Sequence, residues 1–209
     1  MGFFYNCFVC GIPMLFPYHF DSPLTLSAVK IQRENLKELE RQHFADYSVF
    51  ELIANRTQFC DNLLKQLWQQ FELDKAHFTL IAVGGYGRQE IFPLSDLDVL
   101  ILSKEERESE TEEKIAQFVQ FLWDCGFDVG HSVRSLEECE KEGKQDITIA
   151  TNLLESRYLS GDLSLFNVLG EILKKPDFWA VKPFFDAKVQ EQIERYQRYH
   201  NTSYNLEPD

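Results

Sequence analysis

The chain has 209 residues, of which 44% are hydrophobic, so it can bury a core as one domain or as one domain with an appendage. Its 34 acidic and 21 basic residues give a formal net charge of −13, which argues against nucleic acid as a partner, because binding a phosphate backbone needs a broad positive surface. The five cysteines do not form an even disulfide framework, so we expect free thiols and a cytoplasmic location.

The first 20 residues are apolar but show no signal-peptide pattern and no run of about 18 apolar residues that could cross a membrane. We therefore expect no membrane association, and we assign residues 1–20 to an N-terminal extension that could be disordered. Cys7 and Cys10 form a CxxC pair, but no second pair completes a zinc site.

Helices are predicted on both sides of a short strand-rich segment. Residues 21–77 contain one helix over 27–43 and a stronger one opened by a capping box from Ser48 to Glu51. Capping signals at Ser135, Asp146 and Asp162 begin further helices, one of them running from Asp146 to about residue 159, and the remainder of residues 146–209 is expected to be helical.

Three strands are predicted within a core over residues 78–145. They are the segments FTLIAV, LDVLIL and FDVGHSV, and a helix capped by Thr111 connects the second to the third. This order predicts an α+β fold with α/β-like character and a small mixed sheet. Trp68, Trp123 and His131 lie on apolar registers, so we expect all three in the core.

The segment VGGYGRQEIFPLSDLDVLIL contains the candidate site. Asp96 and Asp98 are two residues apart at the start of a strand, so they project to the same face and can supply hard oxygen ligands to a divalent ion. Gly84 and Gly85 leave the preceding turn without side chains, which lets a phosphate group approach backbone N–H groups. Arg88 adds a planar positive charge, and a short helical turn after Gly87 would add the partial charge of its N-terminus.

The spacing excludes two common phosphate-binding motifs. No lysine follows the glycines, as a P-loop requires, and Glu90 occupies the place of the third glycine in a dinucleotide-binding turn. The remaining pattern of Gly-Gly, ten residues and Asp-x-Asp resembles the signature of nucleotidyltransferases related to DNA polymerase beta.

A narrower resemblance covers nearly the whole chain from about residue 20. The stretches AVGGYGRQEIFPLSDLDVLIL, GFDVGHSVRSLEEC, DITIATNLLESRYLSGD and NLEPD are similar to the N-terminal uridylyltransferase domain of the bacterial enzyme family that modifies the nitrogen signal protein PII. The resemblance implies that residues 78–145 are the nucleotidyltransferase core. It also implies a fragment, because the family's full enzyme continues into a phosphohydrolase domain with His-Asp ligands and two sensing domains.

The resemblance implies a metal-dependent transfer of UMP from UTP to a tyrosine of PII. Asp96 and Asp98 would bind Mg²⁺, with Mn²⁺ as an alternative ion, and Gly84, Gly85 and Arg88 would bind the nucleotide. A third carboxylate is usual in this superfamily, and Asp146 is slightly favoured over Asp128 and Glu155. Two alternatives stay open: a nucleotide-binding regulatory module without catalysis, and a transferase that uses another nucleotide such as ATP.

Overall fold

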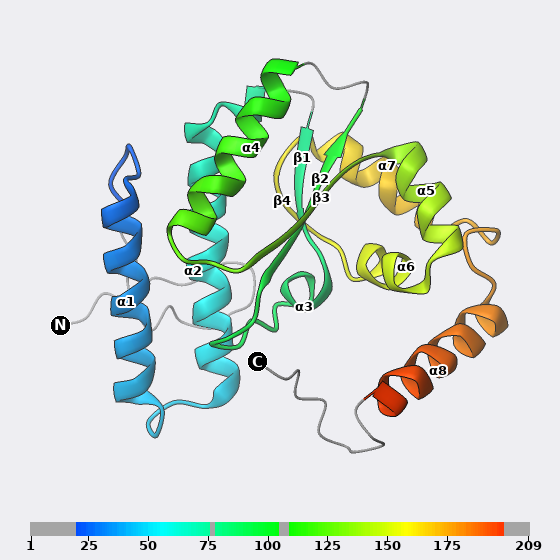
Figure 1. Ribbon diagram of the computed structural model, residues 1–209, viewed down its shortest axis with the longest axis horizontal. Helices are drawn as coiled ribbons and strands as arrows, with labels where there is room; N and C mark the ends of the chain where they lie inside the picture. Colours follow the sequence, from blue (N-terminus) through cyan, green and yellow to red (C-terminus); the bar gives the residue numbers. More distant parts are fainter. Residues whose placement is uncertain (1–19, 76–77, 105–108, 199–209) are drawn as a thin grey trace.

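The computed structural model describes residues 20–75, 78–104 and 109–198. In this part of the chain, one four-stranded sheet is covered by helices on both faces (Figure 1). The strands are β1 (Phe78–Ala82), β2 (Leu97–Ser103), β3 (Val129–Ser135) and β4 (Arg157–Gly161). The helices are α1 (Leu26–His43), α2 (Val49–Gln70), η1 (Leu73–Lys75), α3 (Gly84–Gly87), α4 (Ser109–Asp124), α5 (Leu136–Gln145), α6 (Ile147–Leu154), α7 (Leu163–Leu173) and α8 (Val181–Arg198). This composition confirms the predicted α+β class.

The sheet is mixed, with the strand order β3-β2-β1-β4. β1 pairs antiparallel with β2 and β4, whereas β2 and β3 run parallel and are joined through α4. The prediction of three strands was wrong, because residues 157–161 form β4 instead of continuing the helix that begins after Asp146. Because β4 follows residue 145, the sheet extends beyond the predicted core of residues 78–145. The pairing of β4 with β1 has a register irregularity between Leu80 and Ile81.

Two hydrophobic clusters hold the helices on the sheet. The first lies between the sheet and α1, α2 and α4, and it includes Val99 of β2 and Trp68 of α2, whose ring meets Phe118 edge to face. The second lies on the opposite face under α5, α6 and α7, and it includes Leu100 of β2 and Leu153 of α6. Successive residues of β2 therefore enter opposite clusters, as the alternation of a strand requires.

Side-chain caps fix most of the helix starts that the sequence predicted. Ser48 and Ser135 each form a complete capping box with the glutamate three residues later, and Asp146 and Asp162 cap α6 and α7. The predicted cap at Thr111 was wrong, because α4 is already helical from Ser109 and Thr111 lies inside its first turn.

The core predictions for two of the three aromatic side chains were wrong. Trp68 is fully buried, as predicted, but 47% of Trp123 is exposed and His131 is exposed too. His131 lies on the edge strand β3, where Val129 and Val133 of the same register are partly buried against the first cluster but the His131 ring is exposed and contacts the Trp123 ring. The described cysteines Cys60, Cys125 and Cys139 are buried free thiols, and Cys7 and Cys10 lie outside the described residues.

Residues 1–19 and the NLEPD segment, on which further predictions fall, lie outside the described residues. Phe20, the last residue assigned to the N-terminal extension, is described: it is buried and packs against Phe59 of α2. Within residues 20–75, 78–104 and 109–198, no helix has the length and apolar character needed to traverse a lipid bilayer.

Candidate active site

Asp98 is the central residue of the candidate site. Its neighbours Leu97 and Val99 are buried in the first hydrophobic cluster, so the side chain of Asp98 projects from the opposite face of β2. The carboxylate is half-buried there, at one end of a cavity between the sheet and α6. A rigid strand therefore holds this carboxylate in place.

Two glycines make room for the Asp98 carboxylate. Gly84 begins α3 with a φ of +57°, and a Cβ atom there would lie 3.2 Å from Oδ2 of Asp98. Gly130 is the partner of Asp98 in the parallel β2–β3 register, and a Cβ atom there would overlap Oδ1 of Asp98. Gly84 was predicted, whereas Gly130 was missed; a glycine inside the predicted strand FDVGHSV was the available signal of a close approach.

Asp96 lies just before β2 and is exposed to solvent. Burial raises the pKa of Asp98, and the nearby negative charge of Asp96 raises it further. Two mutually repelling carboxylates of this kind fit a hard divalent ion, which commonly takes one or two carboxylates together with substrate phosphates. The described residues include no group of three Asp, Glu, His or Cys side chains placed to hold a metal.

The three candidates for a third carboxylate have different surroundings. Asp146 accepts hydrogen bonds from the backbone N–H groups of Thr148 and Ile149, so it acts as the N-cap of α6. Glu155 forms an ion pair with Arg88. Asp128 is exposed just before β3, and its carbonyl accepts the N–H of Leu97 at 2.8 Å, which places it next to the Asp96 segment. The role predicted for Asp146 stays a prediction.

The glycine turn follows β1 as predicted, but its helical part differs from the prediction. The helical turn is Gly84–Gly87 itself, not a segment after Gly87. Its start is tied to the strand that carries Asp98, because the N–H of Val83 donates to the carbonyl of Asp98 at 3.0 Å. The first N–H groups of a helix have no acceptor within the helix, and Gly84, the first residue of α3, lies directly beside the carboxylate.

Arg88 is the C-cap residue of the same helical turn. Its guanidinium pairs with Glu90 at 2.8 Å and with Glu155, and 44% of the side chain is exposed. The structure therefore places Arg88 near the turn but outside the cavity lining. A phosphate group that uses Arg88 has to compete with these two carboxylates.

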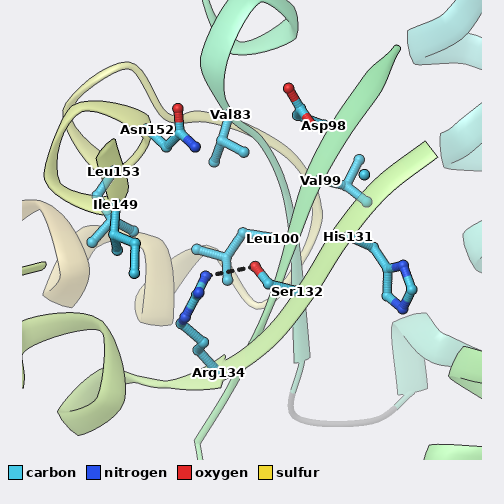
Figure 2. A pocket seen from close by; sticks show the side chains of 11 residues that line it. Val83, Asp98, Val99, Leu100, His131, Ser132, Arg134, Ile149, Asn152 and Leu153 are labelled. Carbon is cyan, nitrogen blue, oxygen red and sulfur yellow. Dashed lines mark hydrogen bonds between the residues drawn. The ribbon is translucent and has the colours of Figure 1, made fainter. Parts of the chain in front are cut away.

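The cavity beside Asp98 has a volume of about 250 Å³ and runs along β2 and β3 towards α6 (Figure 2). At one end, the side chains of Asp98 and Asn152 lie near the glycine turn, and at the other end Arg134 donates a hydrogen bond to Ser132. Apolar side chains line the space between these ends: Val83, Leu100, Ile149 and Leu153. Figure 2 shows the His131 ring on the far side of β3, directed away from the cavity.

A polar network supports the glycine turn from behind. Tyr86 is fully buried in α3, and its hydroxyl donates to Asp61 of α2 at 2.8 Å. Arg157 of β4 pairs with the same carboxylate and also donates to the carbonyls of Tyr86 and Gly87, each at 3.3 Å. The network fixes α3 relative to both the sheet and α2, and sequence reasoning missed it because its members are far apart in the chain.

The chain is similar to known proteins over most of its length. Residues 34–132 match the family described as "Putative nucleotidyltransferase DUF294". The chain is 65% identical over 197 residues to a protein of Haemophilus influenzae (strain PittEE) and 64% identical over 197 residues to one of Pasteurella multocida (strain Pm70). It is 44% identical over 201 residues to a protein of Vibrio cholerae serotype O1.

All three relatives carry the name bifunctional uridylyltransferase/uridylyl-removing enzyme. The matches cover 94% or 95% of this chain but 23% of each relative, so the chain spans less than a quarter of their length. These similarities show that the chain is an enzyme domain of the nucleotidyltransferase type, similar over nearly its whole length to part of the bifunctional uridylyltransferase/uridylyl-removing enzymes.

Proposed function

We propose that this chain transfers UMP from UTP to a tyrosine hydroxyl of the protein PII and releases pyrophosphate. The name uridylyltransferase, which the relatives carry, supports the choice of nucleotide. The observation that carries the proposal is the Asp98 carboxylate, which is held on a strand between Gly84 and Gly130 at the end of a cavity. PII and UTP as substrates, and the cytoplasm as the location, belong to this proposal.

Asp96 and Asp98 are the residues that would hold Mg²⁺, or Mn²⁺ in its place. When bound, the ion neutralises charge on the phosphate oxygens and helps to orient the α-phosphorus. Gly84 lies beside Asp98, and we expect the backbone N–H groups at Gly84 and Gly85 to bind phosphate oxygens, because neither residue has a side chain that would block the approach. Asp98 and the glycine turn keep their relative positions because the hydrogen bond from Val83 joins them.

The reaction is one displacement at phosphorus. The tyrosine oxygen forms a bond to the α-phosphorus, and the bond from this phosphorus to the oxygen that bridges to the β-phosphate breaks, so pyrophosphate leaves with the electron pair. The tyrosine proton passes to a carboxylate base or to water, because a phenol with a pKa near 10 is mostly protonated at neutral pH. Arg88 would bind the leaving pyrophosphate in place of Glu90 and Glu155.

The decisive experiment incubates the purified chain with UTP labelled at the α-phosphate, Mg²⁺ and PII, and then measures label on PII. We expect labelled PII with the wild-type chain and a loss of at least about 100-fold in rate with Asp98→Asn, because removal of even one neutral oxyanion-hole donor costs about 100- to 1,000-fold. Circular dichroism shows whether the variant keeps its fold. Lys182→Met, in an exposed ion pair on α8, serves as the control that keeps activity.

Other outcomes identify the alternatives. Binding of UTP without label transfer would indicate a regulatory module in place of an enzyme. Label transfer from ATP but not from UTP would indicate a transferase of the same fold with another substrate. Asp98→Asn that retained full activity would contradict the assignment of this site.

A further inference from the structure

The end of the cavity remote from Asp98 has no part in the transfer chemistry described above. Arg134 and Ser132 form this end, and both come from β3 on the face that also carries Gly130. From Gly130 to Arg134 the strand advances about 13 Å, taking about 3.3 Å per residue. The Arg134 side chain turns back along the strand to reach Ser132 (Figure 2). The guanidinium can therefore contact a group that is attached to phosphates bound near Asp98.

Two contacts fix the orientation of the Arg134 guanidinium. Nη1 donates to the Ser132 hydroxyl at 2.7 Å, and Nε donates to the Glu142 carboxylate at 2.7 Å. A guanidinium has five N–H donors in one plane, so these contacts leave three donors without a partner among the described residues. Only 23% of the Arg134 side chain is exposed. The guanidinium is therefore a planar donor group with a fixed orientation at the cavity wall.

The space between the two ends suits a flat, largely apolar group. Leu100 of the sheet and Leu153 of α6 line it from opposite sides, together with Val83. Its volume of about 250 Å³ is below the roughly 300–1,000 Å³ of pockets that enclose a drug-sized ligand. The cavity therefore fits a single-ring base, with the sugar and the phosphates extending towards Asp98 and the glycine turn.

We propose that this cavity binds the base of the nucleotide and that Arg134, oriented by Ser132, selects uracil over cytosine. This inference rests on the proposed nucleotidyl transfer. A guanidinium can donate but cannot accept, so it pairs with the O4 carbonyl of uracil and opposes the N4 amino group that cytosine carries at the same position. With cytosine in the cavity, the N4 amino donors would face the guanidinium donors and neither group would form a hydrogen bond, which disfavours binding of cytosine.

The test measures the affinities of the full chain for UTP and for CTP in the presence of Mg²⁺, by isothermal titration calorimetry. We expect the wild-type chain to bind UTP at least about tenfold more tightly than CTP, the ratio that one lost hydrogen bond and one donor clash produce. Arg134→Gln should bring the ratio to within about threefold, because a glutamine amide can accept from cytosine as well as donate to uracil.

Two further variants separate base selection from a structural role of Arg134. Glu142→Gln weakens the ion pair but leaves the donors on the cavity side, so the preference for UTP should persist. Ser132→Ala removes only the hydroxyl that orients Arg134 and should lower the preference at least threefold, which keeps the test valid if Arg134→Gln does not fold.

Three results would overturn the inference. Equal binding of UTP and CTP by the wild-type chain would overturn base selection while leaving the proposed transfer intact. An unchanged preference in Arg134→Gln, or in Ser132→Ala if the glutamine variant is unfolded, would show that Arg134 only stabilises the fold. Failure to bind either nucleotide would overturn the proposed function together with this inference.

Discussion

Arg157 and Asp61 form a two-point ion pair that joins β4 to α2 behind the glycine turn. Nη1 of Arg157 lies 2.6 Å from Oδ2 of Asp61, and Nη2 lies 3.0 Å from Oδ1. The side chains are only 23% and 13% exposed, and the guanidinium also covers the ring of Tyr86 at 5.4 Å. The pair therefore links a helix and an edge strand to the turn that faces Asp98.

Replacing Arg157 with methionine should destabilise the fold. The change leaves the Asp61 carboxylate largely buried without its cation, so we expect the free energy of unfolding to fall by roughly 2–3 kcal/mol. Urea denaturation measures this value. Lys182→Met, which breaks the exposed pair with Asp186, is the matched control and should change stability by less than about 0.5 kcal/mol. Equal losses in both variants would refute a special role for the Arg157 pair.

Replacing Gly130 with alanine should displace the Asp98 carboxylate without unfolding the protein. The new methyl group would overlap Oδ1 of Asp98, so the side chain has to move away from its position between the glycines. We expect the rate of nucleotidyl transfer to fall at least about tenfold, because small misplacements of a catalytic group are costly. Gly170→Ala on α7, which meets nothing within 4 Å, is the control and should keep the rate.

The third carboxylate can be identified by comparing three charge-removing variants. Asp146→Asn preserves the helix cap, because asparagine caps helices about as well as aspartate, so any loss of activity would report on the charge itself. Our prediction from the sequence is a loss of activity in this variant that exceeds the losses in Asp128→Asn and Glu155→Gln. The largest loss in Asp128→Asn would instead assign the role to the residue next to the Asp96 segment. Transfer rates and melting temperatures together separate catalytic from structural effects.

Removal of divalent ions should change the stability of the wild-type chain more than that of Asp98→Asn. An ion that binds the folded state stabilises it by about 1.4 kcal/mol at ten times its dissociation constant. We therefore expect Mg²⁺ to raise the melting temperature of the wild-type chain and to leave that of Asp98→Asn almost unchanged. A similar increase in both proteins would place the ion elsewhere.

The three buried thiols should resist alkylation while the protein is folded. Burial raises the pKa of Cys60 and Cys139 to about 12 and that of Cys125 to about 11, so almost no reactive thiolate exists at pH 8. In a variant with Cys7→Ser and Cys10→Ser, we expect no labelling by iodoacetamide until denaturant is added. Labelling of the folded variant, detected by mass spectrometry, would contradict this expectation.

The sequence alone determined the elements whose signals are local. The capping boxes at Ser48 and Ser135, the glycine turn after β1 and the carboxylates at Asp96 and Asp98 depend on neighbours within a few residues, and each was placed at or near its observed position. The similarity to uridylyltransferases likewise required only the order of residues. Tertiary contacts explain where the predictions failed.

Strand β4 and the exposure of His131 depended on the tertiary structure. The sequence predicted a helix from Asp146 to about residue 159, but residues 157–161 pair with β1, which supplies backbone hydrogen bonds that the local sequence does not reveal. His131 shares its register with Val129 and Val133, which pack against the first cluster, yet its own ring is exposed on the edge strand β3. The cavity between Asp98 and Arg134 also arises only when β2, β3 and α6 come together, because its walls come from segments that are distant in sequence.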